Sequence, residues 1–347
     1  MSDDQTPGYD IPAVEEWLSS QLSSLVAPYV WTKLEGGHSN LTYRIDGADG
    51  AKSAVIRRPP MGKLLPKAHD MGREWACISA LWGREPVAEP LAFCESPDVT
   101  GAHFYVMGLV DAKAMYGRAD VEAWIPAENR VKAAESWIDA LAALHSLDID
   151  EIGLGDLGRR DGYIERQMKT WYRSWTSSAE AAEIDDQRIH DLYDALIAGM
   201  PEPGPTTVVH GDYGTHNVMF DADSTVAAVV DWEIATLGDP MADLGYAMNA
   251  WAEPGDPVID KSEATSLAEG FPSRQHLIDR YATATGRDVS ALPYYRAFNR
   301  FKLTCILHGV YARYRRGQKM IDPDELEEMR QRTFGLIESA AADAEHL

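Results

Sequence analysis

The chain has 347 residues, of which 45% are hydrophobic and 25% charged, so it is long enough for two lobes with separate cores. Its formal net charge of −23 argues against nucleic acid as a partner, because phosphate backbones are bound by clustered lysine and arginine. No stretch approaches the roughly 18 consecutive apolar residues of a membrane-spanning helix, and the acidic start lacks the features of a signal peptide. We therefore expect a cytoplasmic protein without a membrane partner.

The first 110 residues predict a small lobe of mixed α and β structure. In the first predicted helix, Val14, Leu18, Leu22 and Leu25 share one face. Alternating patterns predict short strands, and the prolines at 59 and 60 end one of them. The predicted elements are a helix over 11–26, strands over 41–45 and 54–57, a helix over 67–82, and strands over 91–94 and 103–110.

From residue 129 onward, helical spacing dominates and predicts a larger lobe. Helices are expected over 131–144, 163–175 and 189–200, and again near Asp239, Gln275, Pro293 and Pro323, with three short strands between 206 and 230. We divide the chain into lobes of 1–110 and 111–347, the second with a β insert near 206–233. A ligand cleft is expected where they join, near 109–115.

The three cysteines, Cys77, Cys94 and Cys305, form no CxxC or Cys/His spacing. Each lies in an apolar stretch, so we expect buried free thiols in a reducing compartment.

The β insert contains the strongest motif of the sequence. An apolar strand leads into His210-Gly-Asp212, Asn217 follows five residues after Asp212, and a second apolar strand leads into Asp231. Phosphoryl transfer requires a carboxylate that receives the hydroxyl proton and oxygen ligands for Mg²⁺, and these residues have the spacing of a kinase catalytic loop. The alternative is that they are turn and cap residues. We expect Asp212 as the catalytic base, with Asn217 and Asp231 as metal ligands.

Arg57 ends a strand in the position where kinases place a lysine that binds the nucleotide phosphates. Glu74, on the next predicted helix, is the expected ion-pair partner of this cation. Arg58 points to the opposite face of a strand, so an error of one residue in register would exchange the two arginines. The alternative is a solvated arginine and a solvated glutamate.

Two further segments are candidates for nucleotide binding. The loop Gly36-Gly-His-Ser39-Asn40 lies between two strands, where its backbone N–H groups can face phosphates; the alternative is an ordinary hairpin turn. The strand containing Met107 and Leu109 lies at the lobe junction, where its backbone can face adenine; the alternative is a buried edge strand.

The segments 210–217 and 230–244 resemble the aminoglycoside phosphotransferase and choline kinase superfamily, which implies a two-lobed protein-kinase-like fold. The segments 36–40, 57–69, 104–107 and 162–167 are similar to the kinase-like domain fused to some acyl-CoA dehydrogenases. The resemblance covers about residues 25–335. Because no dehydrogenase segment follows, we expect a stand-alone relative.

The resemblance implies ATP and Mg²⁺ as cofactors and a hydroxyl group of a small molecule as acceptor. It implies the same roles for Asp212, Asn217, Asp231, Arg57 and Glu74, and Asp243 as a brace of the catalytic loop. Many relatives carry Arg and Asp where this chain has Gly214 and His216, so contacts of those side chains are not carried over. Arginine in place of lysine at position 57 leaves a non-catalytic pseudokinase as an alternative.

For the acceptor, the resemblance favours a hydroxy acid or its acyl-CoA thioester, and the basic loop over 57–67 suits an anion. The alternative is an aminoglycoside, because an acidic protein also suits a polycation. A protein kinase is not expected, because no Ala-Pro-Glu follows Asp231. His145 is interpreted as a helix cap, and the oligomeric state is left open. Four tryptophans are expected either to line an apolar pocket or to belong to the core: Trp171, Trp175, Trp232 and Trp251.

Overall fold

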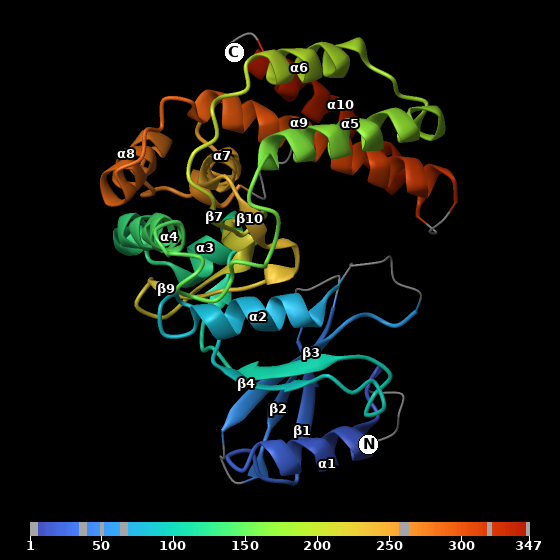
Figure 1. The fold of residues 1–347 in the computed structure, drawn as a ribbon, viewed down its shortest axis with the longest axis vertical. Helices are drawn as coiled ribbons and strands as arrows, with labels where there is room; N and C mark the ends of the chain where they lie inside the picture. The colour runs from blue at the N-terminus through green and yellow to red at the C-terminus, as the bar shows by residue number, and fades with distance from the viewer. Residues whose placement is uncertain are drawn as a thin grey trace.

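A computed structural model describes residues 6–34, 40–48, 52–62, 69–256, 264–317 and 321–344. It has a small antiparallel sheet near the N-terminus and a larger, mainly helical part that contains the C-terminus (Figure 1). The predicted α+β class, with a β-rich first part and a helical second part, is confirmed. Within the described chain, none of the helices combines the length and apolar character that crossing a membrane requires.

The first sheet has five antiparallel strands in the order β1-β2-β3-β5-β4. Arg57 of β3 lies opposite Tyr105 of β5, and Val55 lies opposite Met107, so these four side chains share one face. The strands are β1 (Val30–Lys33), β2 (Leu41–Asp46), β3 (Ser53–Arg58), β4 (Pro90–Cys94) and β5 (Phe104–Gly108).

The two faces of this sheet belong to different hydrophobic cores. Ile56, Phe104 and Val106 pack with the side chains of α1 (Ile11–Gln21). Tyr105, on the other face, belongs to the core that contains α2 (Met71–Leu81) and the helical part. Figure 1 shows α1 and α2 on opposite sides of the sheet, with α2 toward the helical part. The alternation of β3 therefore turns Arg57 toward the junction of the two parts.

Both helices of the first part are shorter than predicted. α1 ends at Gln21 rather than at residue 26, and serines followed by Pro28 come after it, which do not favour continuation of a helix. Leu22 and Leu25 are buried nonetheless. α2 starts at Met71, because the side chain of Asp70 caps it by accepting a hydrogen bond from the backbone N–H of Arg73.

The helical part is organised around one long central helix. Helix α9 (Leu292–Arg315) packs against α5, α7 and α10 (Figure 1). The other helices are α3 (Arg118–Trp124), α4 (Arg130–Leu144), α5 (Tyr163–Ala182), α6 (Gln187–Ala198), α7 (Pro240–Ala250), α8 (Arg274–Thr285) and α10 (Pro323–Ala344).

The predicted β insert is present as short strands. β8 (Val218–Phe220) pairs with β9 (Val226–Val229) and with β6 (Lys113–Ala114), and β7 (Thr207–Val209) pairs with β10 (Thr236–Gly238). The strands β1, β6 and β10 and the helix α3 were not predicted, because these short segments show no clear apolar period. We propose that the lobe boundary falls after residue 110, between the end of β5 and the pairing of β6 with β8.

The cysteines and most of the four tryptophans belong to the interior. All three cysteines are free and buried, as predicted, and burial raises the pKa of the Cys77 thiol to about 12. Trp175, Trp232 and Trp251 are buried core residues rather than the lining of an open pocket, and Trp171 is half-buried.

One buried carboxyl group, that of Glu85 in the turn after α2, makes stability depend on pH. Within the described residues, its Oε1 atom has no hydrogen-bond partner, and burial raises its pKa from 4.5 to about 8. The unfolded chain therefore binds fewer protons than the folded chain between these values, so stability falls as pH rises from 4.5 to 8.

We expect Glu85→Gln to be more stable than the wild type at pH 8, by up to about 4 kcal/mol, because one pKa unit corresponds to about 1.4 kcal/mol. The two proteins should have similar stability near pH 4.5, where the wild-type carboxyl is protonated in the folded state. Urea denaturation at both pH values measures this difference. The exposed Glu89→Gln variant should show no such change. An equal difference for Glu85→Gln at both pH values would contradict the assignment.

Candidate active site

The loop after β7 is fixed by a buried carboxylate. Asp243, 1% exposed on α7, accepts hydrogen bonds from the backbone N–H groups of His210 and Gly211, the latter at 2.8 Å. Gly211 has a φ of 86°, and a Cβ at this position would lie 3.1 Å from Ile234. These contacts turn the chain sharply at the end of the strand. The bracing hydrogen bonds expected of Asp243 are present.

Asp212 follows this turn and is surrounded by hydrogen-bond donors. Its Oδ2 accepts from Asn217 Nδ2 at 3.0 Å and lies 3.4 Å from His216 Nε2, whereas its Oδ1 accepts from the Tyr246 hydroxyl. Burial raises the pKa of Asp212, but the hydrogen bond and charge of His216, and then the hydrogen bond of Tyr246, outweigh burial and lower it below its ordinary value. The side chain is 37% exposed. Asp212 is thus an ionised carboxylate that a ligand can reach.

Asn217 and Asp231 come from adjacent strand ends. The backbone carbonyl of Asn217 accepts a hydrogen bond from the N–H of Val230 at 2.9 Å. Asp231, the next residue after Val230, therefore lies close to Asn217. The Asn217 amide nitrogen donates to Asp212, which leaves its amide oxygen to serve as a ligand atom. Asp231 has a φ of 67°, in the left-handed region, which aspartate adopts more readily than most other non-glycine residues. The three residues of the predicted motif therefore lie in one neighbourhood.

Arg57 links the sheet to this neighbourhood. Its Nη2 lies 2.7 Å from Asp231 Oδ1 and its Nε lies 3.0 Å from Glu74 Oε2. Arg58 points the other way, where it donates to the carbonyl of Thr100 at 2.7 Å and stacks on Tyr9. The geometry thus resolves the register ambiguity in favour of Arg57 as the arginine that faces the site.

A second layer of polar side chains holds this ion pair. The Tyr105 hydroxyl donates to Glu74 at 2.9 Å, and His69 Nδ1 lies 3.2 Å from Glu233 Oε2. Asn40 lies between these groups, where its amide oxygen can accept from Arg57 Nη2 at 2.7 Å. Burial raises the pKa of Glu74, against the opposing effects of Arg57 and of the Tyr105 hydrogen bond. Glu74 is 1% exposed and fully engaged, so it orients Arg57 rather than facing a ligand.

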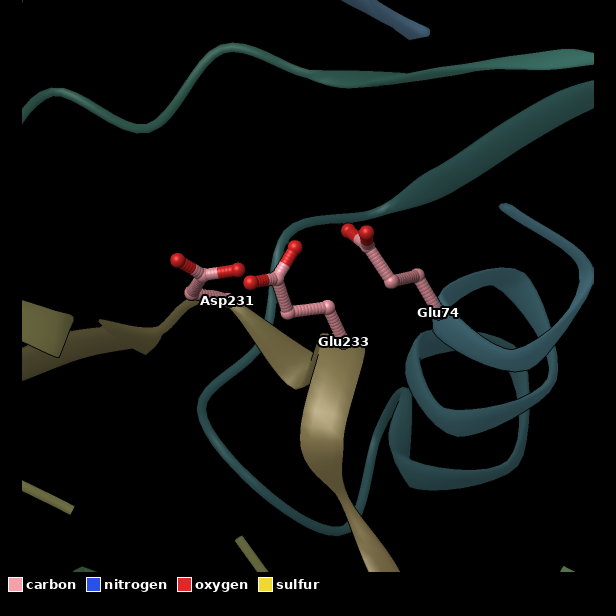
Figure 2. Close-up of side chains that lie close together, drawn as sticks. All are labelled: Glu74, Asp231 and Glu233. Carbon is pink, nitrogen blue, oxygen red and sulfur yellow. The ribbon is translucent and has the colours of Figure 1, made fainter. Parts of the chain in front are cut away.

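The carboxylates of this layer form a group that suits a hard cation. One carboxylate oxygen from each of Glu74, Asp231 and Glu233 lies within 4.8 Å of the others. Figure 2 shows Asp231 and Glu233 on one segment, with Glu74 reaching toward them from a helix. With the amide oxygen of Asn217 these are oxygen donors, which is the ligand type that Mg²⁺ prefers. Glu74 is 1% exposed, whereas Asp231 and Glu233 are 29% and 23% exposed, so the donors that a ligand-bound ion can reach are Asp231 and Glu233, together with Asn217.

The remaining predicted residues have different positions. Ser39 lies outside the described residues, as do residues 35–38 of its loop and residues 63–68 of the basic loop. Met107 is half-buried on the Arg57 face of the sheet. Leu109, 37% exposed, lines a cavity of about 310 Å³ together with Leu22 and Leu25. Their roles, and that of Asn40, in nucleotide binding stay predictions.

His145 is more than a helix cap. It is the C-cap residue of α4, as interpreted from the sequence, but its ring is fully buried between two other helices. Nδ1 lies 2.7 Å from the Tyr281 hydroxyl and Nε2 lies 3.4 Å from Asp243 Oδ2. His145 therefore supports the carboxylate that braces the catalytic loop.

Four residues of this neighbourhood were not predicted as members: His69, Tyr105, Glu233 and Tyr246. The sequence did contain a signal for Glu233, because this carboxylate lies only two residues after Asp231. In the structure Asp231 is followed by a short 3₁₀ turn (Trp232–Ile234) that contains Glu233. There was also a signal for Tyr246, since it lies one helical turn after Asp243 on α7. His69 and Tyr105 approach the site only through the tertiary packing of the sheet and α2.

A small sheet joined to a helical part, with an Asp/Asn/Asp group and an Arg–Glu pair at the junction, is the arrangement of a kinase-like phosphotransferase. The model of the phosphotransferase enzyme family matches residues 30–277, and the chain belongs to this family. It is a small-molecule phosphotransferase with a protein-kinase-like fold, as predicted.

Individual proteins agree with this assignment. The chain is 33% identical over 321 residues to acyl-CoA dehydrogenase family member 11 of Rattus norvegicus, which covers 89% of this chain but only 40% of that protein. A crystal structure of a candidate aminoglycoside phosphotransferase from Ralstonia eutropha matches with a TM-score of 0.81 and 27% identity over 97% of this chain and 99% of that one. Spectinomycin phosphotransferase, solved with ADP and spectinomycin, shares the fold (TM-score 0.62, 13% identity, 97% and 98% covered).

Proposed function

We propose that the chain transfers the γ-phosphoryl group of ATP to a hydroxyl group of a small molecule, with Asp212 as the catalytic base. The observation that carries the proposal is the convergence of Asp212, Asn217 and Asp231 with Arg57 at one place. A non-catalytic pseudokinase is the second candidate, because arginine replaces lysine at position 57. The complete set of a base and oxygen donors favours catalysis.

In the proposed reaction, the acceptor hydroxyl donates a hydrogen bond to the carboxylate of Asp212. Its oxygen forms a bond to the γ-phosphorus while the bond to the leaving ADP oxygen breaks, and the hydroxyl proton passes to Asp212. The hydrogen bonds from Asn217 and Tyr246 hold the carboxylate in a fixed orientation. Against the effect of burial, His216 and then Tyr246 lower the pKa of Asp212, so it stays ionised until the proton arrives.

Asn217, Asp231 and Glu233 are the proposed ligands of Mg²⁺, which when bound neutralises charge on the phosphate oxygens. Arg57 is proposed to bind a phosphate bidentately. In the structure Arg57 is paired with Asp231. On binding of the nucleotide and the metal this ion pair would open, so that Asp231 would contact the cation and Arg57 a phosphate. Glu74 keeps its contact with Arg57 throughout.

We further propose that the nucleotide is ATP and that the acceptor is a hydroxy acid or its acyl-CoA thioester. ATP is supported by the fold shared with a phosphotransferase solved with ADP, and Ser39, Asn40, Met107 and Leu109 are proposed to contact it. A hydroxy acid or its acyl-CoA thioester is preferred over an aminoglycoside, because the rat relative is described as an acyl-CoA dehydrogenase family member.

The proposal is tested by incubating the purified protein with Mg²⁺ and ATP labelled in the γ position, together with hydroxy acids, hydroxyacyl thioesters, aminoglycosides or choline. We expect label in a phosphomonoester of a hydroxy acid or thioester. Label in an aminoglycoside would shift the acceptor class but keep the kinase. Magnesium-dependent ATP binding without transfer to any of these acceptors would favour the pseudokinase.

The variant Asp231→Asn tests the metal assignment. A charge-assisted contact contributes about 1.5–3 kcal/mol, so we expect Mg·ATP to bind roughly 10–100-fold more weakly. In EDTA the variant should bind ATP at least as well as the wild type, because Arg57 is no longer held by a carboxylate. Titration calorimetry with and without Mg²⁺ measures both values. Equal weakening in both conditions would indicate a structural role for Asp231 instead.

A further inference from the structure

Lys302 of α9 lies beside the catalytic loop and has no acidic partner. Its ammonium donates a hydrogen bond to the backbone carbonyl of Gly211 at 3.2 Å, one residue before Asp212. Among the described residues, no carboxylate oxygen lies within the 4.0 Å of an ion pair from its nitrogen. The side chain is half-buried. A half-buried cation that forms no direct ion pair is costly to desolvate, so its position calls for a functional reason.

Tyr246 and Lys302 reach the loop from two helices that pack together, α7 and α9. One turn before Lys302, Asn299 donates to the carbonyl of Ala242 at 2.8 Å, which fixes this face of α9 against α7. Tyr246 donates its hydroxyl to Oδ1 of Asp212. Oδ1 is therefore the side of the carboxylate that is turned toward α7.

The other oxygen of Asp212 is already engaged. Oδ2 accepts from Asn217 at 3.0 Å and faces His216 at 3.4 Å. An acceptor hydroxyl that gives its proton to Asp212 must therefore approach Oδ1, where Tyr246 now donates. Because a carboxylate oxygen has two acceptor positions, the hydroxyl can bind beside Tyr246 or replace it. Either way, the acceptor lies next to Tyr246.

We propose that Tyr246 and Lys302 form the acceptor subsite, and that Lys302 binds a carboxylate or other negatively charged group of the hydroxyl-bearing acceptor. This inference rests on the proposed phosphotransferase function and adds to it the residue that selects an anionic acceptor. Lys302 is anchored on the carbonyl of Gly211 and has further N–H donors for an oxygen of the ligand.

The charge around Lys302 supports an anionic ligand. Burial lowers the pKa of Lys302, and the carboxylates of Asp243 and Asp212 act in the opposite direction. Asp243 accepts hydrogen bonds from the backbone N–H groups of the loop, and Asp212 is the proposed catalytic base, so neither carboxylate pairs directly with Lys302. In a chain of net charge −23, an ammonium kept out of ion pairs at this place is available to an anion. An aminoglycoside, which is a polycation, would be repelled from it.

The experiment compares a hydroxy acid with its uncharged amide, using 3-hydroxyhexanoate and 3-hydroxyhexanamide, and 4-hydroxyhexanoate with its amide. The readout is the ratio of kcat/KM for the acid to that for the amide. We expect a wild-type ratio of roughly 10–100, the value of a hydrogen bond to a charged group. The ratio should fall to about one in Lys302→Gln and stay high in Lys302→Arg. Lys169→Gln, an exposed lysine of α5 paired with Glu165, should match the wild type.

The possible outcomes separate the anionic subsite from the phosphotransferase activity on which it rests. A wild type that phosphorylates the acid and the amide equally well would overturn the anionic subsite but leave the phosphotransferase proposal intact. A loss of activity in Lys302→Gln that is equal for acid and amide would make Lys302 a support of the loop or a contact of the transferred phosphoryl group. A wild type that phosphorylates none of the four compounds would overturn the hydroxy-acid assignment and the subsite together. The wild-type ratio tests the proposal even if Lys302→Gln does not fold.

Discussion

Replacing Asp212 with asparagine is expected to slow phosphoryl transfer by roughly 10²–10⁴-fold, the contribution of a positioned general base. Asparagine has nearly the same shape and still accepts a hydrogen bond from Tyr246, so the loop should keep its conformation. It cannot receive the proton of the acceptor hydroxyl. Rates of labelled phosphate transfer, measured at saturating ATP, give the size of the loss.

The controls for this variant separate chemistry from folding. The Kd for Mg·ATP and the unfolding midpoint should stay near the wild-type values, because Asp212 is not among the proposed metal ligands. Asp161→Asn, an exposed aspartate ahead of α5, should have wild-type activity. Turnover of Asp212→Asn within about threefold of the wild type would rule out the general-base role, since it corresponds to well under 1.4 kcal/mol of barrier.

Replacing Asp243 with alanine is expected to have the largest effect on stability, a loss of about 2–5 kcal/mol. Two buried backbone N–H groups, those of His210 and Gly211, would lose their acceptor, and His145 would lose its carboxylate partner. Burial raises the pKa of Asp243, but hydrogen bonding and charge from His145, followed by His210 and Gly211, lower it overall. Asp243 is therefore an ionised carboxylate that the loop depends on.

Chemical denaturation measures this loss directly. Asp243→Asn should lose less than Asp243→Ala, because its amide oxygen still accepts one of the two N–H bonds. Asp161→Asn serves here as well, as an exposed aspartate whose replacement should change the free energy of unfolding by less than about 0.5 kcal/mol. If Asp243→Ala were as stable as that control, the carboxylate would not be the brace of the loop.

The part of the site that could be predicted from the sequence is the part set by local spacing. Asp212 and Asn217 are five residues apart in one loop, and Asp231 follows the strand that pairs with the one after Asn217. Their approach therefore follows from a single hairpin. The choice between Arg57 and Arg58 required the structure, because alternation in a strand says that they face opposite sides but not which side meets the second lobe.

Two of the residues that were missed, Tyr105 and Lys302, lie at large sequence separation from the motif. Glu74 meets Tyr105, and Lys302 reaches Gly211 from a helix about ninety residues later in the chain. Such contacts depend on how helices pack, and the apolar periodicity that predicts a helix does not give its neighbours. The predicted end of α1 was wrong because Leu22 and Leu25 fit the apolar period of the helix. In the structure they follow its last residue, Gln21, and are buried in the core that the sheet shares with α1.

The most direct test of the account is a crystal structure with Mg²⁺ and a non-hydrolysable ATP analogue. We predict that the ion is bound by Asn217, Asp231 and Glu233. Arg57 should have moved from Asp231 to a phosphate oxygen while keeping its contact with Glu74. The γ-phosphate should face the Oδ1 side of Asp212. A nucleotide bound elsewhere, or an ion that contacts neither Asn217 nor Asp231, would contradict the account.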